Sequence, residues 1–251
     1  MPFPYTDTVV VDGRPYGAAD VRRVLSPYLT PARQARLDAV AAARTFGVVP
    51  ALDGLTDAGN VQAVLRSAEG LGFGAVHLVG LGGEAAVLAD GAPGGGPDAE
   101  TVRAGRRASG GAAAWLAVEA WATPEAYLAA VRARGFAVAT LDVAPGAVPI
   151  ETHDFSRPTV LVLGNERSGP SPAVRDAADV ALLLPLDGFV ESYNVSVAAA
   201  LTLFHARADR ARRTGRAGDL SPDEQATLVA HYTVRAVQHA GPILRREVDG
   251  E

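Results

Sequence analysis

The stretch LPLDGFVESYNVSVAAALTLFHA, residues 184–206, decides the fold. The apolar run 180–184 before Pro185 predicts a buried strand. Three hydroxyl and amide side chains crowd the start of the helix that follows: Ser192, Asn194 and Ser196. That helix is apolar on all sides through Leu203, so we expect it to be buried and the loop before it to lie deep in the structure. One N-cap is enough for a helix, so three candidates favour a pocket at this loop.

Outward from this stretch, apolar runs alternate with helical patterns. The predicted strands are 46–52, 75–80, 136–142, 159–164 and 180–184. The predicted helices are 60–71, 98–108, 124–134, 171–178 and 194–213. This alternation is typical of a parallel sheet with helices on both faces. The predicted fold class is therefore α/β, an open parallel sheet covered on both sides.

Helical segments precede and follow this alternation. Thr30 is the expected N-cap of the second of two short helices near the start of the chain. Ser221 and Glu224 form the pattern of a capping box and predict a last helix over 222–240. The predicted organisation is an N-terminal helical extension, a central domain and a C-terminal helical extension, over residues 1–45, 46–213 and 214–251.

Composition excludes several kinds of site. The 251 residues include no cysteine, which removes disulfides, thiolate nucleophiles and sulfur-ligated zinc. The five histidines are scattered without metal-ligand spacing, so we expect no metal site and no hydrolase. No apolar run approaches the roughly 20 residues of a membrane helix, and the start lacks the pattern of a signal peptide. We therefore expect a cytoplasmic protein with no membrane partner.

All 23 basic residues are arginine, although the formal net charge is −5. The acidic total argues against a general polyanion binder. Arginine binds phosphate bidentately, so local clusters remain candidates for contact with nucleic acid. The clusters are Arg22, Arg23, Arg33 and Arg36; Arg103, Arg106 and Arg107; and Arg207, Arg210, Arg212, Arg213 and Arg216. A solvated helix face is the plainer interpretation of each.

Two further loops carry polar side chains at the carboxyl ends of predicted strands, where open α/β sheets bind ligands. In the first, Asn60 stands where a helix N-cap is wanted, and Arg66 follows two turns later. The second, LVLGNERSGPS at 161–171, includes Gly164, which allows close backbone approach. It also includes Glu166, a carboxylate that needs a partner if it is desolvated at this edge.

The stretches NVQAVLRSAEGLG (60–72), LVLGNERSGPS (161–171) and LPLDGFVESYNVSVAAALTLFHA (184–206) occur in the order of three known motifs. They resemble the motifs of the SPOUT superfamily of methyltransferases, in its TrmH/SpoU branch of RNA ribose 2′-O-methyltransferases. With ASGGAAAWL (108–116), the resemblance covers about residues 46–213. It implies a deep C-terminal trefoil knot, an exception to the rule that chains are unknotted. It also implies S-adenosylmethionine as cofactor and an obligate homodimer with the site at its interface.

The resemblance also implies two sets of site residues. The functional side chains would be Arg66, Asn60, Glu166, Ser192 and Asn194. The cofactor-binding positions would be Thr140, Leu141, Gly164, Leu184, Leu186 and Tyr193. A guanidinium is almost never deprotonated in proteins, so we expect Arg66 to anchor a phosphate and to stabilise a developing alkoxide, while phosphate or water takes the proton.

The substrate that the resemblance implies is RNA, and we favour tRNA, at a D-loop guanosine, over rRNA. Only residues 1–45 precede the central domain, which is too few for the RNA-binding domain of many rRNA-modifying relatives. DFSRPT at 154–159 also looks more like the tRNA branch. Three residues depart from the family pattern: Ala114, Arg167 and Tyr193. Of these, Ala114 weakens the tRNA assignment.

Three other functions stay open. VGLGGEA at 79–85 imitates a dinucleotide-binding fingerprint, but ADGAPGGGP follows it and would break the supporting helix. The second alternative is an RNA-binding relative that does not turn over. The presence of all the functional side chains argues against it. An rRNA 2′-O-methyltransferase of the same family is the remaining alternative.

Overall fold

The structure is a computed structural model that describes residues 3–81 and 111–250. The chain divides into two compact units, one of Phe46–Arg216 and one of Phe3–Thr45 with Ala217–Glu251. The two terminal segments thus share one unit. The predicted helix at 98–108, the fingerprint-like residues from 82 on, and Arg103, Arg106 and Arg107 lie outside the described residues.

The first unit is built on a seven-stranded sheet in which every neighbouring pair is parallel. Its strands in chain order are β3 (Val48–Asp53), β4 (Ala75–Val79), β5 (Ala117–Trp121), β6 (Ala137–Leu141), β7 (Val148–Pro149), β8 (Thr159–Leu163) and β9 (Val180–Leu183). Their order across the sheet is β5-β4-β3-β8-β6-β9-β7. All side chains of β3, β4 and β8 are buried, as expected for central parallel strands.

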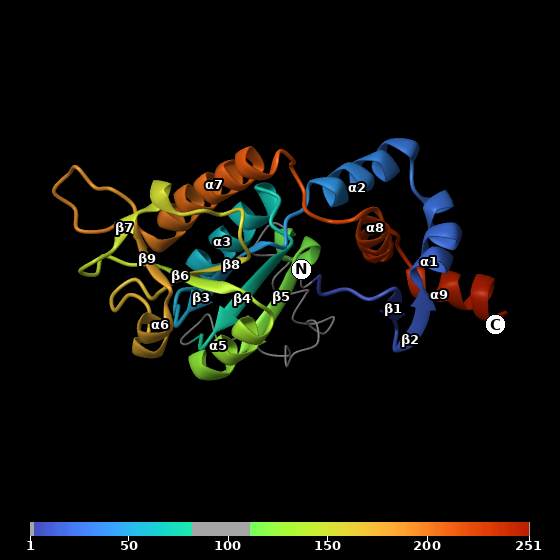
Figure 1. Ribbon diagram of the computed structural model, residues 1–251. Coiled ribbons are helices and arrows are strands. Elements are labelled where there is room, and N and C mark those ends of the chain that lie inside the picture. The colour runs from blue at the N-terminus through green and yellow to red at the C-terminus, as the bar shows by residue number, and fades with distance from the viewer. Residues whose placement is uncertain (1–2, 82–110, 251) are drawn as a thin grey trace. The chain divides into compact units, whose positions relative to one another are not determined.

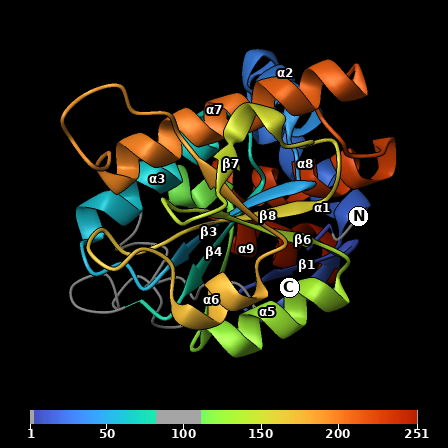
Figure 2. The same cartoon turned by 60° about the vertical axis from the view of Figure 1, so that its left-hand side comes forward.

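Helices cover both faces of this sheet (Figure 1). α3 (Ala58–Gly70) packs beside α7 (Val195–Thr214) on one face, and α5 (Pro124–Ala133) lies beside α6 (Pro172–Ala177) on the other (Figure 2). The described part of the unit also contains two short 3-10 helices, at Ala112–Trp115 and Ile150–Thr152. The predicted α/β fold with helices on both faces is confirmed.

Three local predictions are corrected. β5 and β7 were not predicted, because AVEAW is rich in residues that strands disfavour and β7 has only two residues. α3 begins earlier than expected: its N-cap is Asp57, whose carboxylate accepts the backbone N–H of Asn60 at 2.6 Å. The side chain of Asn60 is therefore not used as a cap.

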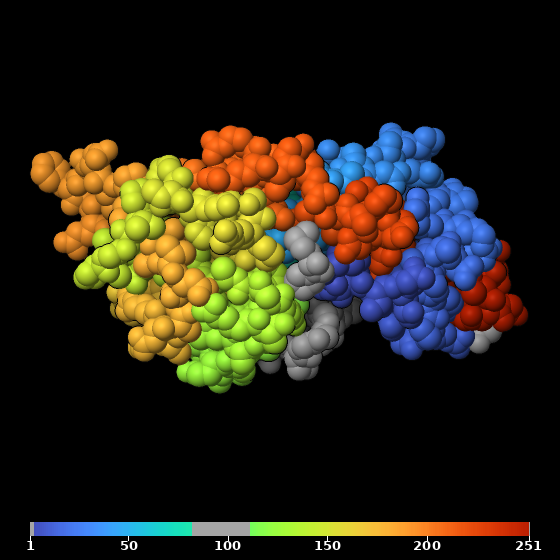
Figure 3. All heavy atoms as spheres, viewed as in Figure 1, coloured from blue at the N-terminus to red at the C-terminus, as the bar shows by residue number. Residues whose placement is uncertain are grey.

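The expected burial of the loop before α7 is also wrong for this single chain. Val197, Leu201 and Phe204 lie on one stripe of α7 and are 47%, 45% and 65% exposed, while the opposite side of the helix packs in the core. In the preceding loop, Pro185 and residues 187–194 are exposed. Figure 3 shows this segment projecting from the first unit.

The second unit combines both ends of the chain. It contains the antiparallel pair β1 (Thr8–Val11) and β2 (Arg14–Gly17), α1 (Ala18–Leu25), α2 (Pro31–Ala43), α8 (Pro222–Ala236), α9 (Ala240–Leu244), a 3-10 helix at Ser26–Tyr28 and a π-helix at Arg245–Asp249. The Thr30 cap and the capping box of Ser221 and Glu224 are confirmed. The last predicted helix is interrupted: α8 ends at Ala236, and His239 adopts a positive φ of 57° before α9.

Within the described ranges, no helix combines the length and the apolar character needed to cross a membrane.

Candidate active site

A cavity of about 320 Å³ opens at the carboxyl edge of the sheet. Its walls come from the ends of β6, β8 and β9, from the loops that follow them, and from the first turn of α7. Five of the six predicted cofactor residues line it: Leu141, Gly164, Leu184, Leu186 and Tyr193. Thr140 does not line it, because its side chain is buried within β6. The motif loops 164–169 and 184–194 thus share one cavity.

Gly164 lies where the loop 164–169 closes on itself. A Cβ at this position would stand 2.0 Å from the Pro170 nitrogen and 2.1 Å from the Gly169 carbonyl carbon. The closure is made by backbone hydrogen bonds in both directions between Asn165 and Gly169, at 3.0 and 2.9 Å. The close backbone approach predicted at Gly164 is confirmed. A residue with a side chain would force this loop open.

Asn165 fixes the same loop to the neighbouring strand end. Its Nδ2 donates to the Gly54 carbonyl at 2.9 Å, and its Oδ1 accepts the backbone N–H of Arg167 at 2.9 Å. Both ends of one side-chain amide are thereby used to hold the loop. The backbone around the cavity is shaped by the chain itself.

Three predicted functional residues form one hydrogen-bonded chain at this edge. Asn194 is the N-cap of α7, and its Oδ1 accepts the Ser196 backbone N–H at 2.9 Å. Its Nδ2 therefore faces Asn60 and donates to Asn60 Oδ1 at 3.4 Å. Asn60 Nδ2 donates in turn to Glu166 Oε1 at 2.9 Å. Asn60 is thus the partner that the sequence analysis required for the Glu166 carboxylate. The two hydrogen bonds also connect all three motifs.

The other two predicted functional residues are placed differently. Ser192 lines the cavity. Arg66 is exposed on the side of α3 that faces away from the core, and it does not line the cavity. Among the described residues, Arg66 makes no hydrogen bond and no ion pair. Its guanidinium is therefore presented to solvent and not to the other four side chains.

Three charged residues of the cavity were missed by sequence reasoning: Asp142, Arg175 and Glu191. Asp142, just after β6, accepts from Arg175 Nε at 2.6 Å, and Arg175 also donates to the Ser168 carbonyl at 3.0 Å. The hydrogen bond to Asp142 raises the pKa of Arg175 above its ordinary value. Asp142 could have been found from the sequence, because an acidic residue at the carboxyl end of a predicted strand indicates a candidate site residue. The sequence carried none for Arg175, which lies on a short helix.

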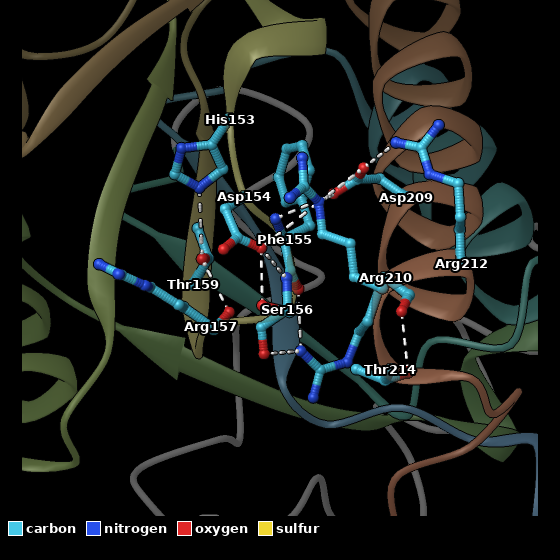
Figure 4. A network of polar contacts seen from close by, with 11 residues as sticks. His153, Asp154, Phe155, Ser156, Arg157, Thr159, Asp209, Arg210, Arg212 and Thr214 are labelled. Carbon is cyan, nitrogen blue, oxygen red and sulfur yellow. Dashed lines mark hydrogen bonds and ion pairs between the residues drawn. The ribbon is translucent and has the colours of Figure 1, made fainter.

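Members of the late arginine cluster make internal contacts, of which Figure 4 shows those of Arg210 and Arg212. Arg210 Nη1 donates to the carbonyls of Phe155 and Ser156 at 2.9 and 2.8 Å. Arg212 and Arg213 form ion pairs with Asp209. Burial alone would raise the pKa of Asp209, but hydrogen bonds from the Phe155 N–H and from these arginines hold it below its usual range. This cluster ties the 153–157 segment to α7, so it is a weaker candidate for contact with nucleic acid.

The cavity fits a small organic ligand better than a metal ion. Leucines and polar residues both line it, and its volume is in the range of small-molecule sites. In the part of the chain that the structure describes, no three His, Asp or Glu side chains are grouped where they could hold a metal.

The chain is similar to known RNA methyltransferases. Residues 96–204 match the SpoU rRNA Methylase family. The chain is 27% identical over 182 residues to tRNA (guanosine(18)-2′-O)-methyltransferase of Escherichia coli K12, which covers 72% of each chain. The crystal structure of the A. aeolicus TrmH/SpoU tRNA modifying enzyme superposes with a TM-score of 0.68, over 86% of this chain and 99% of that one. At 24% identity, this similarity shows the fold. The AdoMet-bound rRNA methyltransferase of Sinorhizobium meliloti gives a TM-score of 0.54 at 27% identity, over 68% of this chain and 59% of that one.

Proposed function

Because this chain belongs to the TrmH/SpoU branch of the SPOUT methyltransferases, we propose that it methylates the 2′-hydroxyl of a ribose in tRNA. One observation carries the proposal: the loops of the second and third motifs line one cavity, and hydrogen bonds tie them to the first motif. The similarity to a tRNA (guanosine(18)-2′-O)-methyltransferase favours a D-loop guanosine as the target. A tRNA substrate fits a cytoplasmic location.

S-Adenosylmethionine, when bound, supplies an electrophilic methyl group. Its adenosine part needs apolar walls and exposed backbone polar groups, and this cavity offers both. Leu141, Leu184 and Leu186 would form the apolar walls, with Tyr193 at the rim. Gly164 shapes the wall made by the loop 164–169, because only a residue without a Cβ lets the backbone of Gly169 and Pro170 come so close.

The polar residues would position the ribose. Methyl transfer requires the 2′-oxygen to lie in line with the methyl group at about 3 Å and its proton to be removed. Hydrogen bonds from Asn194 to Asn60 and from Asn60 to Glu166 hold the Glu166 carboxylate at the cavity. There the carboxylate can still accept a hydrogen bond from a hydroxyl. Ser192 adds a second polar group. Arg66 would anchor a substrate phosphate and stabilise the developing alkoxide.

The decisive test is a methyl-transfer assay with S-adenosylmethionine radiolabelled in its methyl group. The substrates are unmodified transcripts of tRNA and of 23S rRNA fragments, which are collected on filters. We expect label in tRNA, and nucleoside mass spectrometry should identify it as 2′-O-methylguanosine. A tRNA with 2′-deoxyguanosine at the target is the matched control and should accept no label. Label in rRNA alone would move the assignment to rRNA, the activity named for the Sinorhizobium relative. Binding of NAD(H) without S-adenosylmethionine binding would overturn the proposal.

We also propose that the active form is a homodimer with the site at its interface. The support is the apolar stripe of Val197, Leu201 and Phe204 on α7, together with Phe189 and Val190 in the adjacent exposed loop. Aligned apolar side chains of this kind mark interaction surfaces on monomers. Family membership further leads us to propose that the segment from β8 to α7 is threaded as a trefoil knot.

Changing Phe204 to Glu is expected to shift the protein from dimer to monomer, because the charge would have to be buried between two apolar stripes. Sedimentation velocity measures this directly. Val10→Glu, at a 65% exposed position of the second unit, is the control and should leave the mass unchanged. A wild-type protein that sediments as a monomer at every concentration would contradict the dimer.

A further inference from the structure

Arg175 joins three separate segments around the cavity. From α6, its Nε and Nη2 donate to the two Asp142 oxygens after β6, at 2.6 and 3.3 Å. The same Nη2 donates to the Ser168 carbonyl in the loop 164–169, at 3.0 Å. Both charged side chains line the cavity. One guanidinium therefore links the loop to the end of a central strand.

The contact reaches a constrained point of the loop. Gly169 has a φ of +68°, and a Cβ there would stand 2.5 Å from Arg175 Nη2. The guanidinium thus lies directly against the residue whose backbone closes the loop on Asn165. The Asp142 side chain is only 10% exposed, so the ion pair is partly shielded from water. Shielding strengthens such a pair relative to an exposed one.

The same contacts argue against direct binding of a ligand by Arg175. Its Nε and Nη2 hydrogens are already engaged within the protein. The planar fork that would bind an anionic ligand bidentately is largely committed to Asp142. A role in holding the protein backbone fits these contacts better than direct contact with a ligand.

We propose that Arg175 and Asp142 are positioning residues that hold the loop 164–169 closed and thereby set the affinity for S-adenosylmethionine. The inference rests on the proposed function, since it concerns the same cavity. Nothing in the three motifs points to these two residues. Their effect is transmitted through the backbone of Ser168 and Gly169.

The test compares Arg175→Ala with Arg132→Ala, a closely matched control. Arg132 also forms an ion pair with one carboxylate, its Nη1 lying 2.9 and 2.7 Å from the two Asp179 oxygens, and its Nη2 also donates to a carbonyl, that of Ala177. The exposed fractions of the two arginine side chains are 43% and 42%. Arg132 does not line the cavity. A general loss of stability should therefore affect both variants alike.

Calorimetry should show the dissociation constant for S-adenosylmethionine about tenfold higher in Arg175→Ala and within twofold of wild type in Arg132→Ala. Hydrogen exchange without cofactor should be faster at the Gly169 amide in Arg175→Ala only. Asp142→Ala should weaken binding equally, and the double variant no further, because the two residues act as one unit. Arg175→Lys should recover binding only partly.

Equal affinity in wild type and Arg175→Ala, with unchanged exchange at Gly169, would overturn the inference and leave the proposed function intact. A double variant that binds much more weakly than either single variant would show independent ligand contacts, which also contradicts positioning. Failure of the wild-type protein to bind S-adenosylmethionine would instead refute the proposed function. The exchange measurement on the cofactor-free protein still tests the loop in that case.

Discussion

Replacing Arg66 by alanine is expected to lower the turnover number for ribose methylation by about a hundredfold, while the affinity for S-adenosylmethionine stays within twofold of wild type. Arg66 lies outside the cavity and is exposed on α3. Its removal therefore leaves the cofactor walls untouched. What is lost, on the proposed function, is the cation that would anchor a substrate phosphate and stabilise the developing alkoxide. Single-turnover methylation and calorimetry measure the two quantities separately.

The matched control is Gln62→Ala, one turn earlier on the same face of α3. It should retain nearly full activity. Arg66→Lys should recover only part of the rate, because a single ammonium replaces a bidentate fork. Turnover in Arg66→Ala that equals the wild type would discard the role assigned to this residue, whereas a large loss of cofactor affinity would place Arg66 in the cavity of the working enzyme.

Much of the fold was predictable because its central strands and helices carry strong local signals. β3, β4 and β8 are short, almost wholly apolar runs bounded by turn residues, which is the pattern of a buried parallel strand. The edge strand β5 was not predictable from AVEAW, since its residues are only half buried and its pairing with β4 depends on a distant segment. Edge strands depend more on their neighbours than on their own composition.

Site residues that belong to the three motifs were predictable from the sequence. Site residues that only the tertiary structure brings to the cavity were not. The positions of Gly164, Leu184 and Ser192 at one cavity follow from loops that leave β8 and β9, on either side of β6, at the same edge of the sheet. Arg175 acts through a pairing 33 residues distant in sequence, which no local pattern reveals. The exposure of α7 was misjudged for a related reason. An apolar helix must be covered, but its sequence does not say whether the same chain or another one covers it.

The substitution Gly164→Ala is expected to abolish saturable binding of S-adenosylmethionine and to lower the free energy of unfolding by about 3 kcal/mol. The added Cβ would lie 2.0–2.4 Å from backbone atoms of Gly169 and Pro170. Backbone atoms cannot rotate away as a side chain can, so the loop must open and give up its hydrogen bonds to Asn165. Calorimetry and urea unfolding measure the two effects.

Gly188→Ala distinguishes this collision from a general effect of adding a methyl group. Gly188 belongs to the segment between β9 and α7, yet a Cβ there meets no atom within 4 Å. It should therefore bind the cofactor normally and unfold at a urea concentration close to that of wild type. If Gly164→Ala behaved like Gly188→Ala, the loop 164–169 would have to be loose in solution. A cavity shaped by its closed backbone could then not be the basis of cofactor binding.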